Sequence, residues 1–155
     1  MIKLPEPTLS PLCHFEVMLA APMEMGMGPG GRRRIIPIIG GRVTGERLQG
    51  TILNLGADWQ TVYADSTAFL DTRYAMQTDD GAIIEIRNLG LRHGPPAVMA
   101  ALARGESVDP ASYSMRTHAR FETGDPRYDW VNRVLAVGVG AREASAVHLN
   151  LYEIL

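Results

Sequence analysis

The stretch from Gly40 to Leu91 constrains the fold of this chain most strongly, because it contains one short strand pattern after another. β-Branched and apolar residues alternate with polar ones along it, which is the two-residue period of a strand with one buried face. Asp80-Gly81 is a strong hairpin signal within it, because both residue types tolerate positive φ. The stretch therefore predicts consecutive antiparallel strands joined by tight turns.

Strand patterns also flank this stretch. Further runs with the length and alternation of strands lie at residues 12–21, 112–122, 134–139 and 146–154. Pro95–Arg104 predicts the main helix, because prolines suit its first turn and Gly105 follows as a stop signal. By contrast, the glycine- and methionine-rich segment 22–31 predicts a loop, either a lid beside a barrel mouth or a disordered connection.

The number of strands predicts how the sheet ends. Eight or more antiparallel strands with one minor helix indicate an all-β fold, a closed antiparallel β-barrel of lipocalin-like size, because closure removes exposed sheet edges. We expect a single β-barrel domain over residues 1–155, in which residues 1–11 form an extended lead-in. A chain of 155 residues can bury an adequate core without disulfides or structural metals.

Several short motifs in a fixed order resemble a known family. They are Gly56-Ala57-Asp58-Trp59, Asp71-Thr72-Arg73-Tyr74, Thr78–Ile83 and Arg127–Arg133, with a closing strand from Val147 to Ile154. In order and spacing they resemble the bacterial and fungal family catalogued as domain of unknown function three-two-three-seven, from about Leu12 onward. The resemblance implies a small antiparallel β-barrel that associates into oligomers, and it implies no particular reaction.

Charge excludes some classes of partner. The net charge of −2 and the pI near 6.1 provide no basic face for nucleic acid. The one basic run, Arg32-Arg33-Arg34, is expected at a solvated strand start or an oligomer contact rather than as a phosphate clamp. This run, the edge-like strand around Pro37 and the family resemblance together lead us to expect a homodimer or higher homo-oligomer.

Targeting and redox features are sparse. No window reaches the roughly 18 apolar residues of a spanning helix, and the N-terminus lacks the apolar core of a secretory signal. We therefore expect a cytoplasmic protein with no membrane partner. Cys13 is the only cysteine, and its apolar setting indicates a small buried side chain rather than a nucleophile.

Motifs for cofactors and for familiar catalytic machinery do not occur in the sequence. It contains no GxSxG, HExxH, Walker loop or GxGxxG after a strand, and its four histidines show no ligand spacing. We therefore expect a protein that works without a metal or any other cofactor. The lumen of a barrel with about eight strands can be filled by side chains or can hold one small ligand.

Asp71 and Arg73 are the leading candidates for a site. They lie two positions apart in the middle of a strand and so share a face, which in a closed barrel could be the lumen. Arg73 would then hold a carboxylate or enolate oxygen through two N–H bonds, while Asp71 would keep the guanidinium in place. The alternative is a buried ion pair that only fixes strand register.

Other residues complete the predicted lumen. Glu16 or His118 would carry the proton if either faces inward. The candidate ligand-binding residues are Trp59, Tyr63, Tyr74, Trp130 and Asn132. A tryptophan beside tight turns can stack on a flat ligand, or it can plug the end of a barrel.

These features favour cofactor-independent acid–base chemistry on a small organic acid or carbonyl compound, of the isomerase, cyclase, addition or lyase type. The alternative is a non-catalytic barrel that binds or carries a small apolar metabolite. A structural subunit with a solid barrel is a third possibility. An open lumen with an acid or base beside Arg73 favours the enzyme, and an open apolar lumen favours the carrier.

Overall fold

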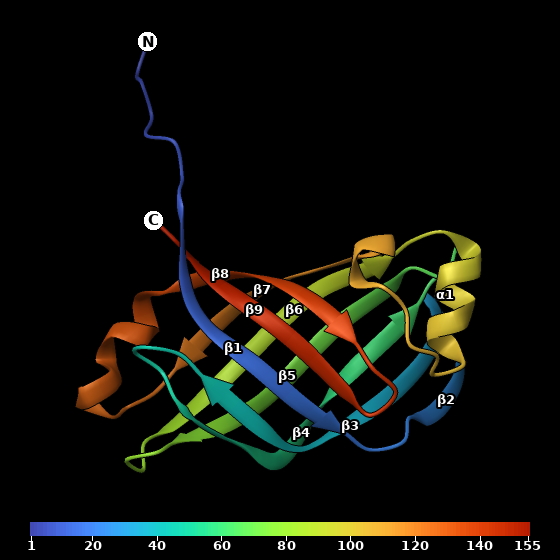
Figure 1. Cartoon of the computed structure of the whole chain (residues 1–155), viewed down its shortest axis with the longest axis horizontal. Helices are drawn as coiled ribbons and strands as arrows, with labels where there is room; N and C mark the ends of the chain where they lie inside the picture. Colours follow the sequence, from blue (N-terminus) through green and yellow to red (C-terminus); the bar gives the residue numbers. More distant parts are fainter.

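The computed structural model describes residues 1–155, most of which form one antiparallel sheet rolled into a closed barrel (Figure 1). Eight strands form the closed wall, and the short strand β2 is added along part of it. The strands are β1 (Leu9–Leu19), β2 (Met23–Gly28), β3 (Gly31–Thr44), β4 (Gly50–Val62), β5 (Ala68–Thr78), β6 (Ile83–His93), β7 (Ser114–Glu122), β8 (Leu135–Arg142) and β9 (Ala146–Ile154). The predicted all-β barrel is confirmed.

Strand β3 closes the barrel. The sheet order is β1-β9-β8-β7-β6-β5-β4-β3-β2, and one edge of β3 pairs first with β2 and then with β1. The change of partner falls between Ile35 and Ile38. Just beyond it, Gly41 has a φ of 135° and lies directly against the Glu16 carbonyl of β1. A Cβ atom at Gly41 would collide with that carbonyl, so only glycine allows this crossing.

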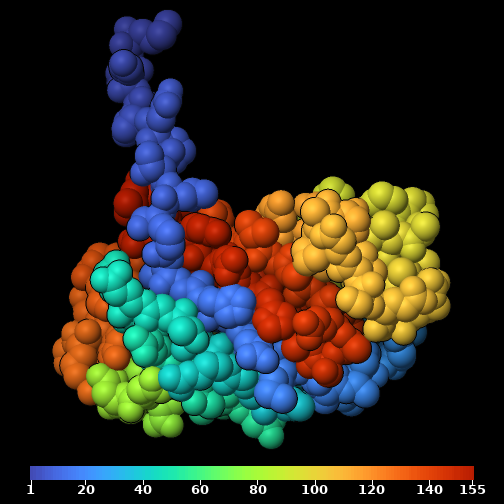
Figure 2. Space-filling view, viewed as in Figure 1, coloured from blue at the N-terminus to red at the C-terminus, as the bar shows by residue number.

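Three segments differ from the sequence prediction. The methionine-rich segment is not a loop, because the backbone of β2 pairs with β3 from Met23 to Gly28. In the β5–β6 hairpin only Gly81 has positive φ, so the turn is not of type I′ at Asp80-Gly81. Strand β1 already begins at Leu9, so the extended lead-in comprises residues 1–8 and projects from the barrel (Figures 1 and 2).

The helical elements lie at the two ends of the barrel (Figure 1). They are α1 (Pro96–Ala103), the 3-10 turn η1 (Pro110–Ser112) and the 3-10 segment η2 (Pro126–Arg133). The predicted helix and its stop are confirmed, since Gly105 has a φ of 76° and donates its N–H to the carbonyl of Leu102. None of these helices is long and apolar enough to cross a membrane.

Aromatic packing fills the half of the barrel near η2. Phe15 makes edge-to-face contacts with Tyr74 and Phe121, with ring centroids 6.3 and 6.5 Å apart. Val131 of η2 is buried in the same core, and the partly buried Trp130 packs against it. The η2 end is therefore closed by side chains, and an open site has to lie toward α1.

Candidate functional site

The face of β5 that lines the lumen is the opposite of the predicted one. Its buried or half-buried inward residues are Ala68, Leu70, Thr72, Tyr74 and Met76. Asp71 and Arg73 are exposed on the outer face, where Arg73 forms a salt bridge of 3.2 Å with Glu85 and keeps 62% of its side chain exposed. The prediction that this pair faces the lumen is wrong, because the apolar positions of the strand take the core and the charges stay hydrated.

The two predicted proton carriers also lie outside. Glu16 on β1 and His118 on β7 are both exposed, since each alternates with buried residues that occupy the inner face. Their proposed role depended on an inward orientation, and neither side chain has it.

Four of the five predicted ligand-binding residues lie away from the lumen. Trp59 is 46% exposed on the outer face of β4, and Tyr63 is exposed just after that strand. Trp130 lies at the η2 end with the Arg47 guanidinium 3.8 Å from its ring centroid. The Asn132 side chain is bonded to both backbone groups of Thr123, at 2.9 and 3.0 Å. Only Tyr74 lines the lumen cavity.

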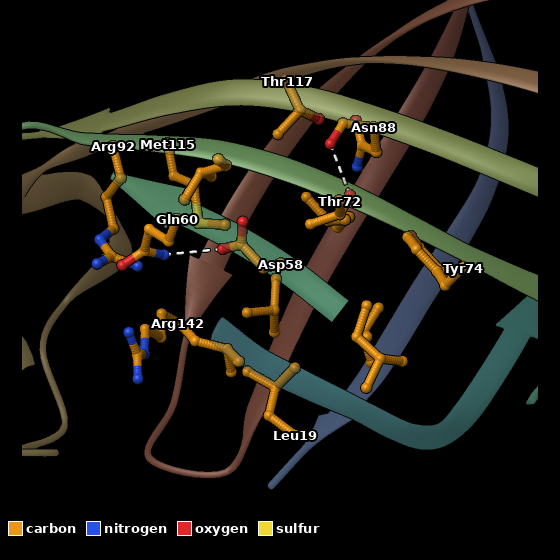
Figure 3. A pocket seen from close by; sticks show the side chains of 16 residues that line it. Leu19, Asp58, Gln60, Thr72, Tyr74, Asn88, Arg92, Met115, Thr117 and Arg142 are labelled. Atoms are coloured by element: carbon orange, nitrogen blue, oxygen red, sulfur yellow. Dashed lines mark hydrogen bonds between the residues drawn. The ribbon is translucent and has the colours of Figure 1, made fainter. Parts of the chain in front are cut away.

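The half of the lumen toward α1 contains a cavity of about 40 Å³ (Figure 3). This volume exceeds the space that one water molecule needs. Part of its lining is apolar and comes from Val17, Leu19, Ile36, Ile38, Leu70 and Leu149. Met115 and Val147 also line it, and its polar side chains come from β4, β5, β6, β7 and β8. Inward-facing residues of neighbouring strands therefore form the site.

Asp58 of β4 is the central acid of this cavity and is only 7% exposed. One carboxylate oxygen accepts a hydrogen bond from the Gln60 amide at 2.8 Å, and the other accepts the backbone N–H of Asp71 at 2.9 Å. Asp71 thus contributes through its backbone rather than its side chain. Burial raises the pKa of Asp58, and this effect outweighs the hydrogen bonds and nearby positive charges that act in the opposite direction.

Three arginines lie near this acid without forming an ion pair with it. Arg34 donates from Nε to the Gln60 amide oxygen at 2.7 Å, so it supports Asp58 through Gln60. The Nε atoms of Arg92 and Arg142 are buried and have no hydrogen-bond partner. Figure 3 shows both guanidinium groups on the same side of Asp58. The cluster therefore has an excess of positive charge with unused donors.

Burial and mutual repulsion both act on Arg92. It is 5% exposed, and burial lowers its pKa, with further lowering by the charges of Arg142 and Arg34. Arginine remains protonated at neutral pH even so. An anion bound between Arg92 and Arg142 would supply the partner that the protein does not, through paired N–H donors suited to a carboxylate.

A second polar group lies deeper in the lumen. The Tyr74 hydroxyl, the Asn88 amide oxygen and the Thr117 hydroxyl are buried and have no hydrogen-bond partner in the protein. The Asn88 side chain adjoins the Tyr74 hydroxyl without reaching hydrogen-bonding geometry. The cavity therefore has a charged rim, where Arg142 is half-buried, and a neutral floor, where Asn88 is 3% exposed.

Sequence reasoning missed most of these residues, although a signal existed for two of them. On β6, Asn88 and Arg92 share the parity of Ile84 and Ile86, so simple alternation places all four inside. Arg34 was expected at a solvated or oligomer contact, yet it is buried and points inward with Ile36. Nothing in the local pattern marks Arg142, whose position follows only from barrel closure.

Fold and site together define a small closed antiparallel barrel with a charged, partly open lumen, and comparison with known proteins gives its family. The family model described as "Protein of unknown function (DUF3237)" matches residues 7–154. The chain therefore belongs to this family, in agreement with the motifs of the sequence. It is 45% identical over 125 residues to the UPF0311 protein RPA1785 of Rhodopseudomonas palustris, which covers 81% of this chain and 82% of that protein.

Solved structures share the same barrel. The crystal structure of the Rhodopseudomonas palustris protein has a TM-score of 0.92 and 38% identity, covering 99% of this chain and all of the other. A "beta-barrel like protein" from Acinetobacter baumannii has a TM-score of 0.88 and 43% identity, covering both chains fully. A structure titled as an enzyme from Penicillium herquei has a TM-score of 0.74 over both full chains but 21% identity, which establishes likeness of fold alone.

Proposed function

We propose that this protein is a cofactor-independent acid–base enzyme that acts on a small organic anion in the half of the lumen toward α1. One observation carries the proposal: the buried Asp58 carboxyl group lies among guanidinium groups that have no anionic partner. A buried acid with a perturbed pKa in a cavity is a recognised mark of an active site. The position and charge of these groups favour proton transfer next to a carboxylate or carbonyl group.

Each side chain has a distinct role in this proposal. Arg92 and Arg142 bind the anionic end of the substrate and stabilise the negative charge that develops when a neighbouring carbon loses a proton. Asp58 accepts that proton and returns it at another position, and its raised pKa brings it closer to neutral pH, where a general base works best. Gln60 holds both Asp58 and Arg34, at 2.8 and 2.7 Å, and so fixes the distance between acid and cations.

The alternative functions fit the cavity less well. A purely apolar metabolite would leave the buried Nε atoms of Arg92 and Arg142 without a hydrogen-bond partner, which is costly once the ligand excludes water. A solid structural barrel does not need a buried acid beside three arginines. The Penicillium herquei protein with the same fold is described as an enzyme, so this barrel is compatible with catalysis, although fold alone does not define a reaction.

Proton exchange in D₂O tests the proposal without knowledge of the natural substrate. Pyruvate, 2-oxobutanoate and phenylpyruvate each carry an anionic group beside a carbonyl and an exchangeable carbon-bound proton. We expect the wild-type protein to accelerate loss of that proton's NMR signal, and Asp58→Asn to remove at least about 100-fold of the acceleration, the usual contribution of a general base.

Two surface variants serve as matched controls for this assay. Glu16→Gln removes an exposed carboxylate from the outer face of β1, and Arg73→Met removes an exposed guanidinium from β5. Both should exchange at the wild-type rate, whereas Arg92→Met should lose most of the acceleration. Exchange no faster than in buffer, or equal exchange by wild type and Asp58→Asn, would contradict the proposal.

A further inference from the structure

The floor of the cavity contains a recognition site of its own, separate from the charged rim. We propose that Tyr74, Asn88 and Thr117 bind a hydroxyl group at the end of the substrate opposite its anionic group. The inference rests on the proposed function, since it identifies the substrate as a small hydroxy acid. It starts from three polar side chains that are more than nine-tenths buried, line the cavity and have an unpartnered oxygen atom.

Strand register places Tyr74 and Thr117 on either side of Asn88. On β5, Tyr74 is the cross-strand partner of Ile86, two residues before Asn88 on β6. On β7, Thr117 is the partner of Gly90, two residues after Asn88. Both are therefore diagonal neighbours of Asn88 on the inner face, about 7–8 Å from it between Cα atoms, and they lie on opposite sides of it. Figure 3 shows Asn88 and Thr117 side by side, with Tyr74 farther along the lumen.

The donors and acceptors at the floor match a hydroxyl group. A hydroxyl donates one hydrogen bond and accepts two. It can donate to the Asn88 amide oxygen and accept from the Tyr74 hydroxyl. The Thr117 hydroxyl lies beside Gly138 of β8 and would turn toward this group by rotation about χ1. A carbonyl oxygen would leave the Asn88 oxygen without a donor. Burial raises the pKa of Tyr74, so its hydroxyl stays protonated and able to donate.

The separation between floor and rim sets the length of the ligand. Arg92 and Asn88 lie on the inner face of β6, four residues apart, which is about 13 Å along a strand between Cα atoms. Their side chains shorten this gap, and Met115 and Leu149 line the cavity alongside the polar groups. The spacing of the polar groups suits a compact body with a carboxylate at one end and a hydroxyl at the other, and such a ligand has to widen the cavity of about 40 Å³ as it enters.

Positional isomers of one compound test this inference. The probes are benzoate and 2-, 3- and 4-hydroxybenzoate, whose dissociation constants are measured by calorimetry with the full-length protein. We expect 3- or 4-hydroxybenzoate to bind about tenfold more tightly than benzoate, because benzoate leaves the buried floor groups unpaired. The 2-isomer, whose hydroxyl adjoins the carboxylate, should show no such advantage.

Variants separate the floor from the rim. Each floor variant should reduce the preference for the hydroxylated isomer while benzoate still binds; these variants are Asn88→Leu, Tyr74→Phe and Thr117→Val. The control is Tyr63→Phe, which removes an exposed hydroxyl and should leave the preference unchanged. Arg92→Met should weaken all four ligands by a similar factor. If Arg92→Met weakens binding but the floor variants keep the preference, the hydroxyl site is overturned alone. If wild type binds none of the anions at millimolar concentration, or Arg92→Met binds them equally well, the proposed function is overturned as well.

Discussion

Replacement of Arg92 by methionine should make the empty protein more stable while it weakens binding. Arg92 is 5% exposed and its Nε atom lacks a hydrogen-bond partner, so its charge is desolvated and the nearby Asp58 charge offsets only part of that cost. Burial, first, and the charges of Arg142 and Arg34 lower its pKa from the ordinary value to about 10. At 1.36 kcal/mol for each pH unit, this corresponds to a penalty of about 3 kcal/mol in the folded state.

Methionine keeps an unbranched apolar stem in place of the inner part of the arginine side chain, so little packing should be lost. Replacement of a buried ion by an apolar residue of similar volume can stabilise a protein by about 1–4 kcal/mol. We therefore expect Arg92→Met to raise the free energy of unfolding by about 1–3 kcal/mol. In a domain of this size, each kcal/mol corresponds to roughly 2–4 °C in melting temperature.

The assay is chemical and thermal unfolding with and without benzoate. Arg73→Met is the control, because Arg73 is exposed and its salt bridge with Glu85 should contribute less than about 1 kcal/mol. Saturating benzoate should stabilise the wild type and leave Arg92→Met almost unaffected, which reverses their order. A loss of more than about 1 kcal/mol in ligand-free Arg92→Met would refute the reasoning, because it would mean that the protein itself already satisfies this charge.

Three further predictions follow from other side chains. Burial raises the pKa of Asp58 above its value in the unfolded chain, which is about 3.9. As pH rises from that value through the folded pKa, the wild type should therefore lose stability relative to Asp58→Asn. A pH series of urea titrations in which the difference in unfolding free energy stays constant would count against this. Burial raises the pKa of the Cys13 thiol to about 12, so it should react with a thiol reagent at pH 8 only after unfolding, and reaction in the native protein would disprove it. Trp59 is 46% exposed on the outer face of β4, next to Ile35 of β3, so Trp59→Lys should weaken the self-association that we expect. If sedimentation equilibrium of the wild type shows only a 16.9 kDa species, the expected association itself is contradicted.

The barrel could be predicted because its signals are local. The alternation on β1 and β7 correctly separates Phe15 and Val17 from Glu16, and Phe121 from His118. The helix and its end could also be predicted from local sequence, since Gly105, in the left-handed conformation, follows α1 as expected. Cys13 is buried, as its apolar neighbours indicated.

The site is harder to predict, because the charged residues of β5 and its alternating apolar residues point to opposite faces of the strand as the inner one. The charged pair Asp71 and Arg73 suggests an inward site, whereas Leu70, Tyr74 and Met76 on the other face of β5 carry the apolar pattern. Desolvation opposes buried charge, so the apolar set decides the face unless closure of the barrel supplies compensating groups. Asp58 and Arg142 have such a setting only because barrel closure brings strands β4 and β8 to one cavity, which no local window of the sequence contains.

The closed η2 end makes the lumen a blind channel, so molecules have to enter and leave by the same route. Trp130 and Arg47 cover the far end, and the half-buried Arg142 marks the rim of the other. A ligand held at both ends must therefore enter with its hydroxyl leading, and its anionic group is the last part to dock. If the reaction divides the ligand, the fragment at the arginines has to depart before the fragment at Asn88 can follow. The barrel would in this way impose an order of product release without any moving lid.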